Sequence, residues 1–547
     1  MIISPTASQT SRSGSGGGSQ AGSGSGGSLY LVVGELAGAG AIRANGGGGE
    51  VGGGGGRIAV HYATFSVDAS QLEVLGGQGS SRQGGNGTLC LIGPGQTWGD
   101  LVIDGLGQST PSSSSPIPDG YIFDNIRLRN QARVVADAPL HVTGAVEVLT
   151  GSVLTHTVGK EAGLRIEATS VFVDGTSSID ASSRGYPGAR RDGNAADYGL
   201  TLGRLPGAVY SAGGTYAGYG GVYDGAGSNR PYGHPAQAVY LGSGGSRGYY
   251  SEAGGTGGGR ITIVAEDFVK IDGAIRANGG GGDGSHAGSG SGGSIDITTG
   301  VIRGTGWIIA NGGVAEVGGG GGRIVITANA PGGAGDDLAA LRNATAFGGH
   351  GSSRWGSAGT VLFRDSVADP GVLYVDDGLE DATSSVYTPL TPICFGTVAD
   401  VTDDTLTTDG KVPLMPNGLV GVEINPNIDQ DATFLIVSNT EDTVTVDTGG
   451  KVSLTAVADV GDTYVGVYRF REVRFRRGGF LVTGDRVVVD DAMVIDEYGR
   501  VTHFDATTTF ESRLDLTAGE LVVAETGSIN VNMRGYLGGN HNGSGSS

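Results

Sequence analysis

The sequence predicts an all-β protein built as a right-handed parallel β-helix, a solenoid, with glycine-rich loops and one small inserted β-domain. Three observations predict it. Glycine fills 109 of 547 positions, long segments of the chain recur, and a shorter pulse of roughly 30 residues recurs inside each long unit. A chain of this length exceeds one compact core, so an elongated repeat array is favoured over a single globule.

The long repeats are nearly exact in places. Three pairs of segments match: 40–49 with 273–282, 21–28 with 287–294, and 79–82 with 351–354. Residues 528–536 also parallel residues 178–186, so a further unit begins near the end of the chain. Because repeats are under way at both ends, we expect the chain to be part of something longer.

The short pulse has the form of one solenoid coil. After a glycine run, an alternating apolar segment begins, as at 259–263, 293–297 and 322–326. A second apolar run and an Ala-Asn-Gly-Gly corner follow. Asn and Gly tolerate the positive φ of tight turns, and two or three short strands per turn are what a parallel β-helix coil requires.

Composition shifts divide the chain into four parts. The only helical pattern lies at 336–342, with an aspartate cap. Between the coils, residues 421–424, 433–437 and 443–446 alternate cleanly and read as an inserted β-domain. The expected parts are 1–125, coils of a first unit; 126–378, coils of a second unit with a Gly/Tyr-rich excursion at 184–254; 379–470, the inserted domain; and 471–547, the start of a further unit.

The charge balance excludes some partners. There are 55 acidic and 34 basic residues, a net charge of −21. Nucleic acid is therefore not expected as a partner, and no apolar run approaches the ~18 residues of a membrane span. The acidity fits a soluble extracellular or cell-surface protein, and Ca²⁺ is the one cofactor such a surface would hold.

Tyrosines gather in the excursion. Aromatic rings among small residues can stack on sugar faces or other surfaces at low entropic cost. An alternative is that they anchor a glycine-rich segment too flexible to fold without them. The candidates for glycan or surface contact are Tyr210, Tyr216, Tyr219, Tyr223, Tyr232 and Tyr240.

An acidic cluster supplies oxygen ligands of the kind that Ca²⁺ prefers. It follows neither an EF-hand spacing nor a calcium-binding nonapeptide, so a solvated loop is the alternative. The candidate ligands are Asp400, Asp403, Asp404 and Asp409.

Catalysis is not predicted. His350 and Arg354, with Asp376-Asp377, resemble the histidine, arginine and paired aspartates of β-helical pectin hydrolases, in which carboxylates activate water. The first unit has Gln78 where the second has His350, and the order along the chain is reversed, so a polysaccharide hydrolase or lyase stays an alternative. Cys90 aligns with Leu362 and is therefore expected to be a buried apolar side chain.

The repeats carry a family resemblance. Segments of the forms GGSGGSI, ANGG and GGGGRI, at 292–295, 44–47 and 53–58 among others, are similar to the large glycine-rich repeat surface proteins of bacteria. The resemblance implies a β-helical, extracellular protein and transfers no catalytic residue. We expect a structural or adhesive segment, a stalk, fibre or adhesin, that contacts surface glycans or self-associates into fibres. The alternatives are a carbohydrate-binding or polysaccharide-degrading β-helix and a phage fibre component with packed polyglycine layers.

Overall fold

The computed structural model describes residues 22–106, 113–223, 226–328, 343–379, 386–450 and 452–536. Over these residues the protein is all-β, as predicted, and its only helical turns are Ala69–Gln71, Leu202–Arg204 and Leu454–Ala456. The predicted helix at 336–342 lies outside the described residues. No helix in the described ranges is long and apolar enough to cross a bilayer.

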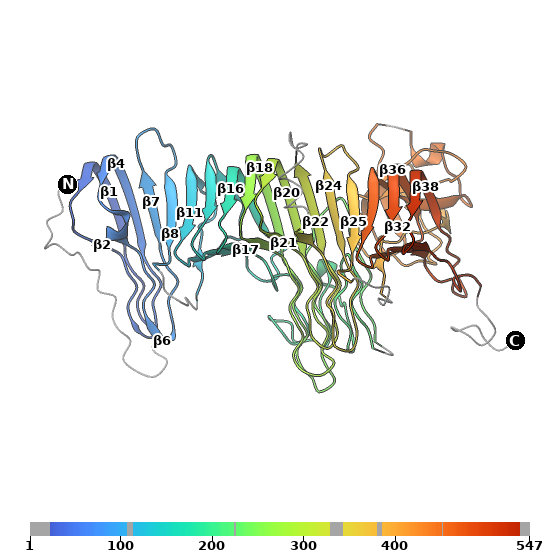
Figure 1. The fold of residues 1–547 in the computed structure, drawn as a ribbon, viewed down its shortest axis with the longest axis horizontal. Coiled ribbons are helices and arrows are strands. Elements are labelled where there is room, and N and C mark those ends of the chain that lie inside the picture. The colour runs from blue at the N-terminus through green and yellow to red at the C-terminus, as the bar shows by residue number, and fades with distance from the viewer. Residues whose placement is uncertain are drawn as a thin grey trace.

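One large sheet runs along the molecule, and its strands follow one another along the long axis in Figure 1. Each strand pairs with the next in parallel, except that β7 with β8 and β24 with β25 are antiparallel. The strands are β1 (Ser28–Ala37), β4 (Arg57–Ser66), β7 (Thr88–Ile92), β8 (Asp100–Asp104), β11 (Asn125–Arg129), β14 (Ala145–Val148), β16 (Leu164–Val173), β18 (Arg260–Ile271), β20 (Ser294–Arg303), β22 (Arg323–Ala328), β24 (Thr360–Arg364), β25 (Val372–Asp376), β34 (Glu472–Arg476), β36 (Arg486–Ile495) and β38 (Asp515–Val523).

Smaller parallel sheets accompany the large one. One consists of β9 (Ser115–Pro116), β12 (Arg133–Val135), β15 (Val153–Thr155), β17 (Ser178–Asp180), β19 (Ala274–Arg276), β21 (Trp307–Ile309) and β23 (Ala344–Thr345). Another consists of β26 (Thr388–Pro389), β35 (Phe480–Thr483), β37 (Arg500–His503) and β39 (Ser528–Ile529). Two short pairs are β2 (Ile42–Arg43) with β5 (Leu72–Glu73) and β3 (Gly49–Val51) with β6 (Gly79–Arg82). The strands β10 (Ile122–Phe123) and β13 (Leu140–Val142) also pair in parallel, but they belong to the large sheet, where β13 pairs with β16.

The strands stack in register, so equivalent side chains form rows. Leu164, Ile261, Ile295, Ile324 and Val361 occupy one such row on five consecutive strands, and all five are buried. Because the short sequence pattern repeats, an apolar side chain occupies the same register position on each of these strands. The row therefore fills the interior without a separate packing solution for each strand.

The buried face of the large sheet changes at each antiparallel pair. Leu89 of β7 lies opposite Val102 of β8, and both face a first core. Leu101 and Ile103 alternate with Val102 and face a second core on the opposite side. The second core, which spans residues 101–361, thus begins within 1–125, the range assigned to the first unit.

The reverse exchange occurs at β24 and β25. Val361 faces the second core, whereas Leu362 pairs with Leu373, and both belong to a third core. Cys90, which aligns with Leu362, is only half-buried. The expectation of a buried Cys90 is therefore wrong, because the third core that covers Leu362 has no equivalent over β7.

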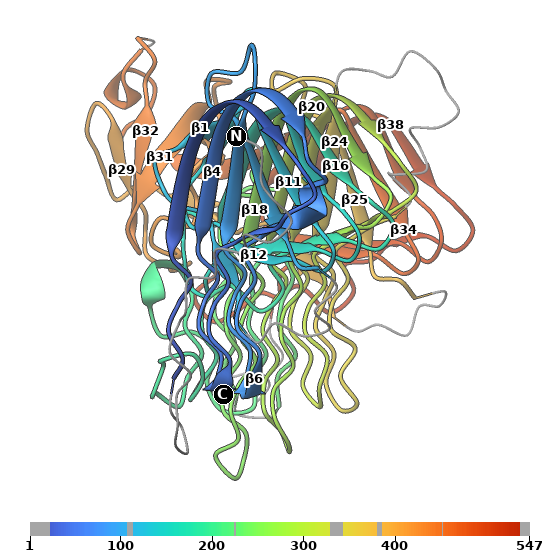
Figure 2. The same ribbon diagram turned by 90° about the vertical axis from the view of Figure 1, so that its left-hand side faces the viewer.

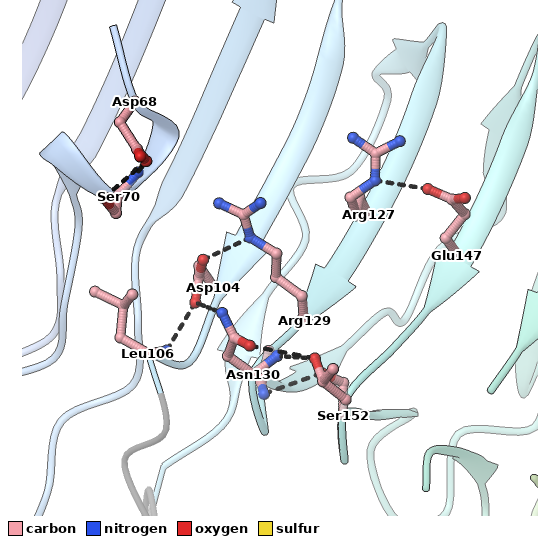
Figure 3. A network of polar contacts seen from close by, with 11 residues as sticks. Asp68, Ser70, Asp104, Leu106, Arg127, Arg129, Asn130, Glu147 and Ser152 are labelled. Carbon is pink, nitrogen blue, oxygen red and sulfur yellow. Dashed lines mark hydrogen bonds and ion pairs between the residues drawn. The ribbon is translucent and has the colours of Figure 1, made fainter. Parts of the chain in front are cut away.

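Ion pairs link neighbouring strands on the solvent side of the sheet (Figure 3). Arg127 lies opposite Glu147, with Nε 2.6 Å from a carboxylate oxygen, and Arg129 donates to Asp104 at 2.5 Å. Asn130 Nδ2 also donates to Asp104 at 2.9 Å. Such half-exposed pairs add little stability singly, but pairing opposite charges across the ladder favours the observed register.

The insert has no core of its own. Its antiparallel strands are β27 (Gly396–Thr397), β28 (Asp400–Val401), β29 (Thr405–Thr407), β30 (Glu423–Asn425), β31 (Phe434–Asn439), β32 (Thr443–Asp447) and β33 (Thr463–Phe470). Phe434 and Val444 from the insert share the third core with Val473 and Val487 of the coils. β33 also pairs in parallel with β36, so the insert is continuous with the sheet.

The glycine runs are packed segments rather than open loops. Below the sheets in Figures 1 and 2 they lie side by side in two groups, blue and green to yellow. We call them the first glycine lobe (residues 22–27, 44–56 and 74–87) and the second glycine lobe (residues 185–223, 226–259, 277–293, 310–322 and 346–359). Residues 254–259 have no regular secondary structure, as expected of a glycine-rich loop, but all six are buried.

Backbone groups bond to one another on several sides in the second lobe. The segment 288–293 accepts from Gly214, Gly255 and Gly313 and donates to Gly280 and Gly320, among others, at 2.8–2.9 Å. A strand in a sheet has two neighbours, whereas this segment has more. Such close approach requires glycine, since a Cβ on Gly290 would lie 2.2 Å from the Thr256 carbonyl oxygen.

Replacing Gly290 with Ala is predicted to lower the free energy of unfolding by about 1–3 kcal/mol, because the methyl group collides with fixed backbone atoms. Gly34→Ala is the matched control, since no atom lies within 4 Å of its would-be Cβ. Urea denaturation of both variants measures the difference. Equal midpoints would contradict the close-packed lobe.

Candidate functional site: an aromatic strip on the second glycine lobe

The six candidate tyrosines differ in how far they are buried. Tyr216 and Tyr232 are fully buried, with ring centroids 4.8 Å apart, and they leave no ring face for a ligand. Both contact the buried Arg323, whose guanidinium lies 5.2 Å from the Tyr216 ring and donates to the Tyr232 carbonyl at 2.9 Å. These two tyrosines are anchors of the lobe, and their assignment as glycan contacts is wrong because burial removes them from solvent.

The other four lie nearer the surface. The Tyr240 hydroxyl donates to the Asn417 carbonyl of the insert at 3.1 Å, and burial raises the pKa of Tyr240 to about 12. The half-buried Tyr219 packs edge-on against Tyr387. Tyr210 is 67% exposed beside Arg247. Through Tyr387, Tyr219 joins a group that includes Phe480, and Tyr223 belongs to a second group of aromatic side chains.

That group begins with two exposed rings. Tyr249 and Tyr250 are 72% and 77% exposed, and their centroids are 5.1 Å apart. Tyr249 lies 6.3 Å from the His286 ring, which lies 4.5 Å from Tyr223. The ring planes of Tyr249 and Tyr250 are 84° apart, and His286 is tilted by 53° to both Tyr249 and Tyr223. Exposed aromatic rings of this kind suit contact with sugar rings or with another surface.

The group continues into a cavity. The Arg354 guanidinium stacks over Tyr223 at 4.6 Å, and the neighbouring Trp355 packs on His350 at 5.0 Å with ring planes 27° apart. Here a cavity of about 450 Å³ is lined by Gly220, Gly221, Val222, Ser353, Arg354, Trp355 and Val386. We call the set the aromatic strip: Tyr250, Tyr249, His286, Tyr223, Arg354, Trp355 and His350.

Glu316 fixes the middle of the aromatic strip. It accepts from the backbone N–H of His286 (2.9 Å), the Tyr223 hydroxyl (2.9 Å) and the Ser353 hydroxyl (3.1 Å). These bonds, that of His286 first, lower the pKa of Glu316. The carboxylate therefore stays charged and positions residues from three separate segments.

The first glycine lobe repeats this scaffold without the aromatic side chains. Ser81 donates to Glu50 at 3.3 Å, as Ser353 does to Glu316. Where His350 and Trp355 stack in the second lobe, Gln78 and Gln83 form a 2.9 Å hydrogen bond in the first. The framework alone thus folds without aromatic rings, so the aromatic strip is an addition to it. Tyr223 comes from the Gly/Tyr-rich excursion at 184–254.

The residues that resemble a pectin hydrolase do not form one site. His350 Nε2 lies 3.9 Å from Asp377 Oδ1, but Asp377 is only 2% exposed. Asp376 instead pairs with Arg477, and Arg354 stacks on Tyr223. The two aspartates therefore do not face a common substrate position.

The candidate calcium ligands do not converge. Over the described residues, no three His, Cys, Asp or Glu side chains gather into a group that could hold a metal ion. Asp403 accepts from Thr455, Asp404 from Thr402 and Thr405, and Asp409 pairs with Lys411 at 3.0 Å. Asp400 accepts from the N–H of Val401. Asp400, Asp404 and Asp409 thus bond within their own turns and Asp403 bonds across to Thr455, so each has a partner inside the protein.

A larger groove of about 570 Å³ lies where the insert meets the last turns. It is lined by Phe395, Gly396, Thr397, Lys411, Thr463, Thr507, Thr508, Thr509, Phe510, Glu511 and Tyr536. Its base is fastened by the fully buried Asp485, which accepts from the N–H groups of Ile393, Cys394 and Gly466 at 3.1, 2.6 and 3.1 Å. Asp485 thus joins the two ends of the insert.

Comparison of this chain with protein-family models, with curated proteins and with solved structures found no match. Its function is therefore argued from its own residues.

Burial raises the pKa of Asp485 from 3.8 to about 7, against the opposing effect of its three N–H donors. The folded state then binds a proton that the unfolded state has released, so this stabilisation, on the order of 4 kcal/mol at most, is lost as pH rises through about 7. We expect the stability advantage of the wild type over Asp485→Asn to shrink between pH 4 and pH 8 in urea titrations. The exposed Asp400→Asn is the control, and a pH-independent difference for Asp485→Asn would contradict the shift.

Proposed function

We propose that the chain is a structural and adhesive segment of an extracellular or cell-surface protein, folded as a right-handed parallel β-helix. One observation carries the proposal: most strands from β1 to β38 pair in parallel and in register along one axis, and the chain between them is of similar length except across the excursion and the insert. Such an array grows by adding turns and bears its side chains on long faces, which suits a stalk or fibre.

The change of buried face at the two antiparallel pairs is compatible with a solenoid that keeps one handedness along its whole length. Reversing strand direction alone, while continuing along the axis, would turn a right-handed coil into a left-handed one. Each antiparallel pair reverses both the strand direction and the buried face, and the two reversals cancel. One right-handed sense, which parallel crossover connections favour, can therefore be kept throughout.

Negative-stain electron microscopy of the purified chain should show a short rod, alone or joined end to end, and the rod should persist in EDTA because Asp403, Asp404 and Asp409 already bond within the protein. A compact globule would contradict the β-helix. Collapse in EDTA would instead assign the acidic cluster to Ca²⁺.

The aromatic strip favours glycan contact as the adhesive activity. Its rings are stacked on a rigid glycine framework, so binding would not require ordering a flexible loop. In the first lobe a glutamine pair stands where the second lobe has His350 and Trp355, so these two rings are not needed to build the framework.

Trp355→Ala and Tyr249→Ala should each weaken binding to arrayed glycans about tenfold or more, because each removes a stacking face. Trp307→Ala removes an exposed tryptophan from β21 outside the lobe and should leave binding unchanged. Melting temperatures of all three variants check folding. Equal binding by all of them would contradict glycan contact at the aromatic strip.

A further inference from the structure

We propose that the glycan held by the aromatic strip carries carboxylate groups, as a uronate chain does, and that Arg354 selects it. This inference rests on the proposed glycan contact. It concerns the end of the aromatic strip where Arg354 and Trp355 line the cavity.

The Arg354 guanidinium is held in place with one edge left open. Nε donates to the Val222 carbonyl and Nη1 to the Ser353 carbonyl, both at 3.1 Å, while the plane stacks on Tyr223. Within the described residues, no acceptor bonds Nη2. A guanidinium fixed in this way can offer its remaining N–H groups to a carboxylate with little further entropic cost.

Over the part of the chain that the structure describes, no carboxylate forms an ion pair with Arg354. Glu316 instead receives hydrogen bonds from His286, Tyr223 and Ser353. Glu252, at the far end of the aromatic strip, accepts from the N–H of Tyr250 at 2.8 Å. Arg354 is thus left as the cation that faces the cavity.

Trp355, which lines the cavity next to Arg354, favours an anion that also carries an apolar ring face. Trp355 presents an apolar face beside the guanidinium, which suits a pyranose ring carrying a carboxylate at its edge. A nucleic acid or a densely sulfated chain would require several cations, whereas Arg354 is the one cation among the described residues that line this cavity. A uronate chain, with one carboxylate per ring, matches a single arginine between aromatic faces.

The test compares a polygalacturonate oligosaccharide with its methyl ester by calorimetry. The wild type should bind the acid about tenfold more tightly, and added salt should reduce that preference. Arg354→Gln should abolish the preference while retaining binding of the ester. Arg82→Gln, the equivalent change in the first lobe, should alter neither affinity.

Arg354→Lys guards against misfolding of the turn, because it keeps the charge and should retain part of the preference. Equal wild-type affinity for acid and ester, or a preference that survives Arg354→Gln, would overturn the selection by Arg354 and leave the glycan contact standing. Failure to bind either ligand, together with no binding on the array, would overturn the glycan contact itself.

Discussion

The need to pair every buried backbone N–H and C=O group governs this structure. The protein meets it in two ways. In the sheets, parallel ladders pair each strand with the turn before and the turn after, and apolar rows such as Ile261, Ile295 and Ile324 fill the interior. In the glycine lobes, backbone segments bond on several sides, and no side chain fits between them, as at Gly290 and Gly319. Glycine is therefore abundant because of packing, not because the chain needs flexible loops.

Glycine runs lead directly into several of the alternating strands, as Gly257 to Gly259 lead into β18, so paired strands and packed glycine segments follow one another along the chain. Where β7 meets β8 and β24 meets β25, the buried face changes and a new core begins. The insert extends the third core rather than forming a separate domain, and Asp485 ties both of its ends to the coil.

The lobes also explain how a binding surface arises on a repetitive scaffold. Glu50 and Glu316 accept from equivalent serines, so the framework is the same in both lobes. The second lobe differs in its side chains: His350 and Trp355 replace a glutamine pair, and Tyr223 and Tyr249 come from the Gly/Tyr-rich excursion. A backbone fixed by close packing places such additions with little loss of conformational freedom.

The sequence by itself determined the all-β class, the parallel pairing and the repeat, because strand periodicity and glycine placement are local features that each turn shares. It also indicated that tyrosines were concentrated in one segment. Only the tertiary structure decided which of them are anchors, since Tyr216 and Tyr232 become buried through contacts with Arg323, a residue far along the chain. The aromatic strip, the face exchange and the shared third core likewise depend on long-range contacts. Alternation along one strand gives two faces but does not say which one is covered.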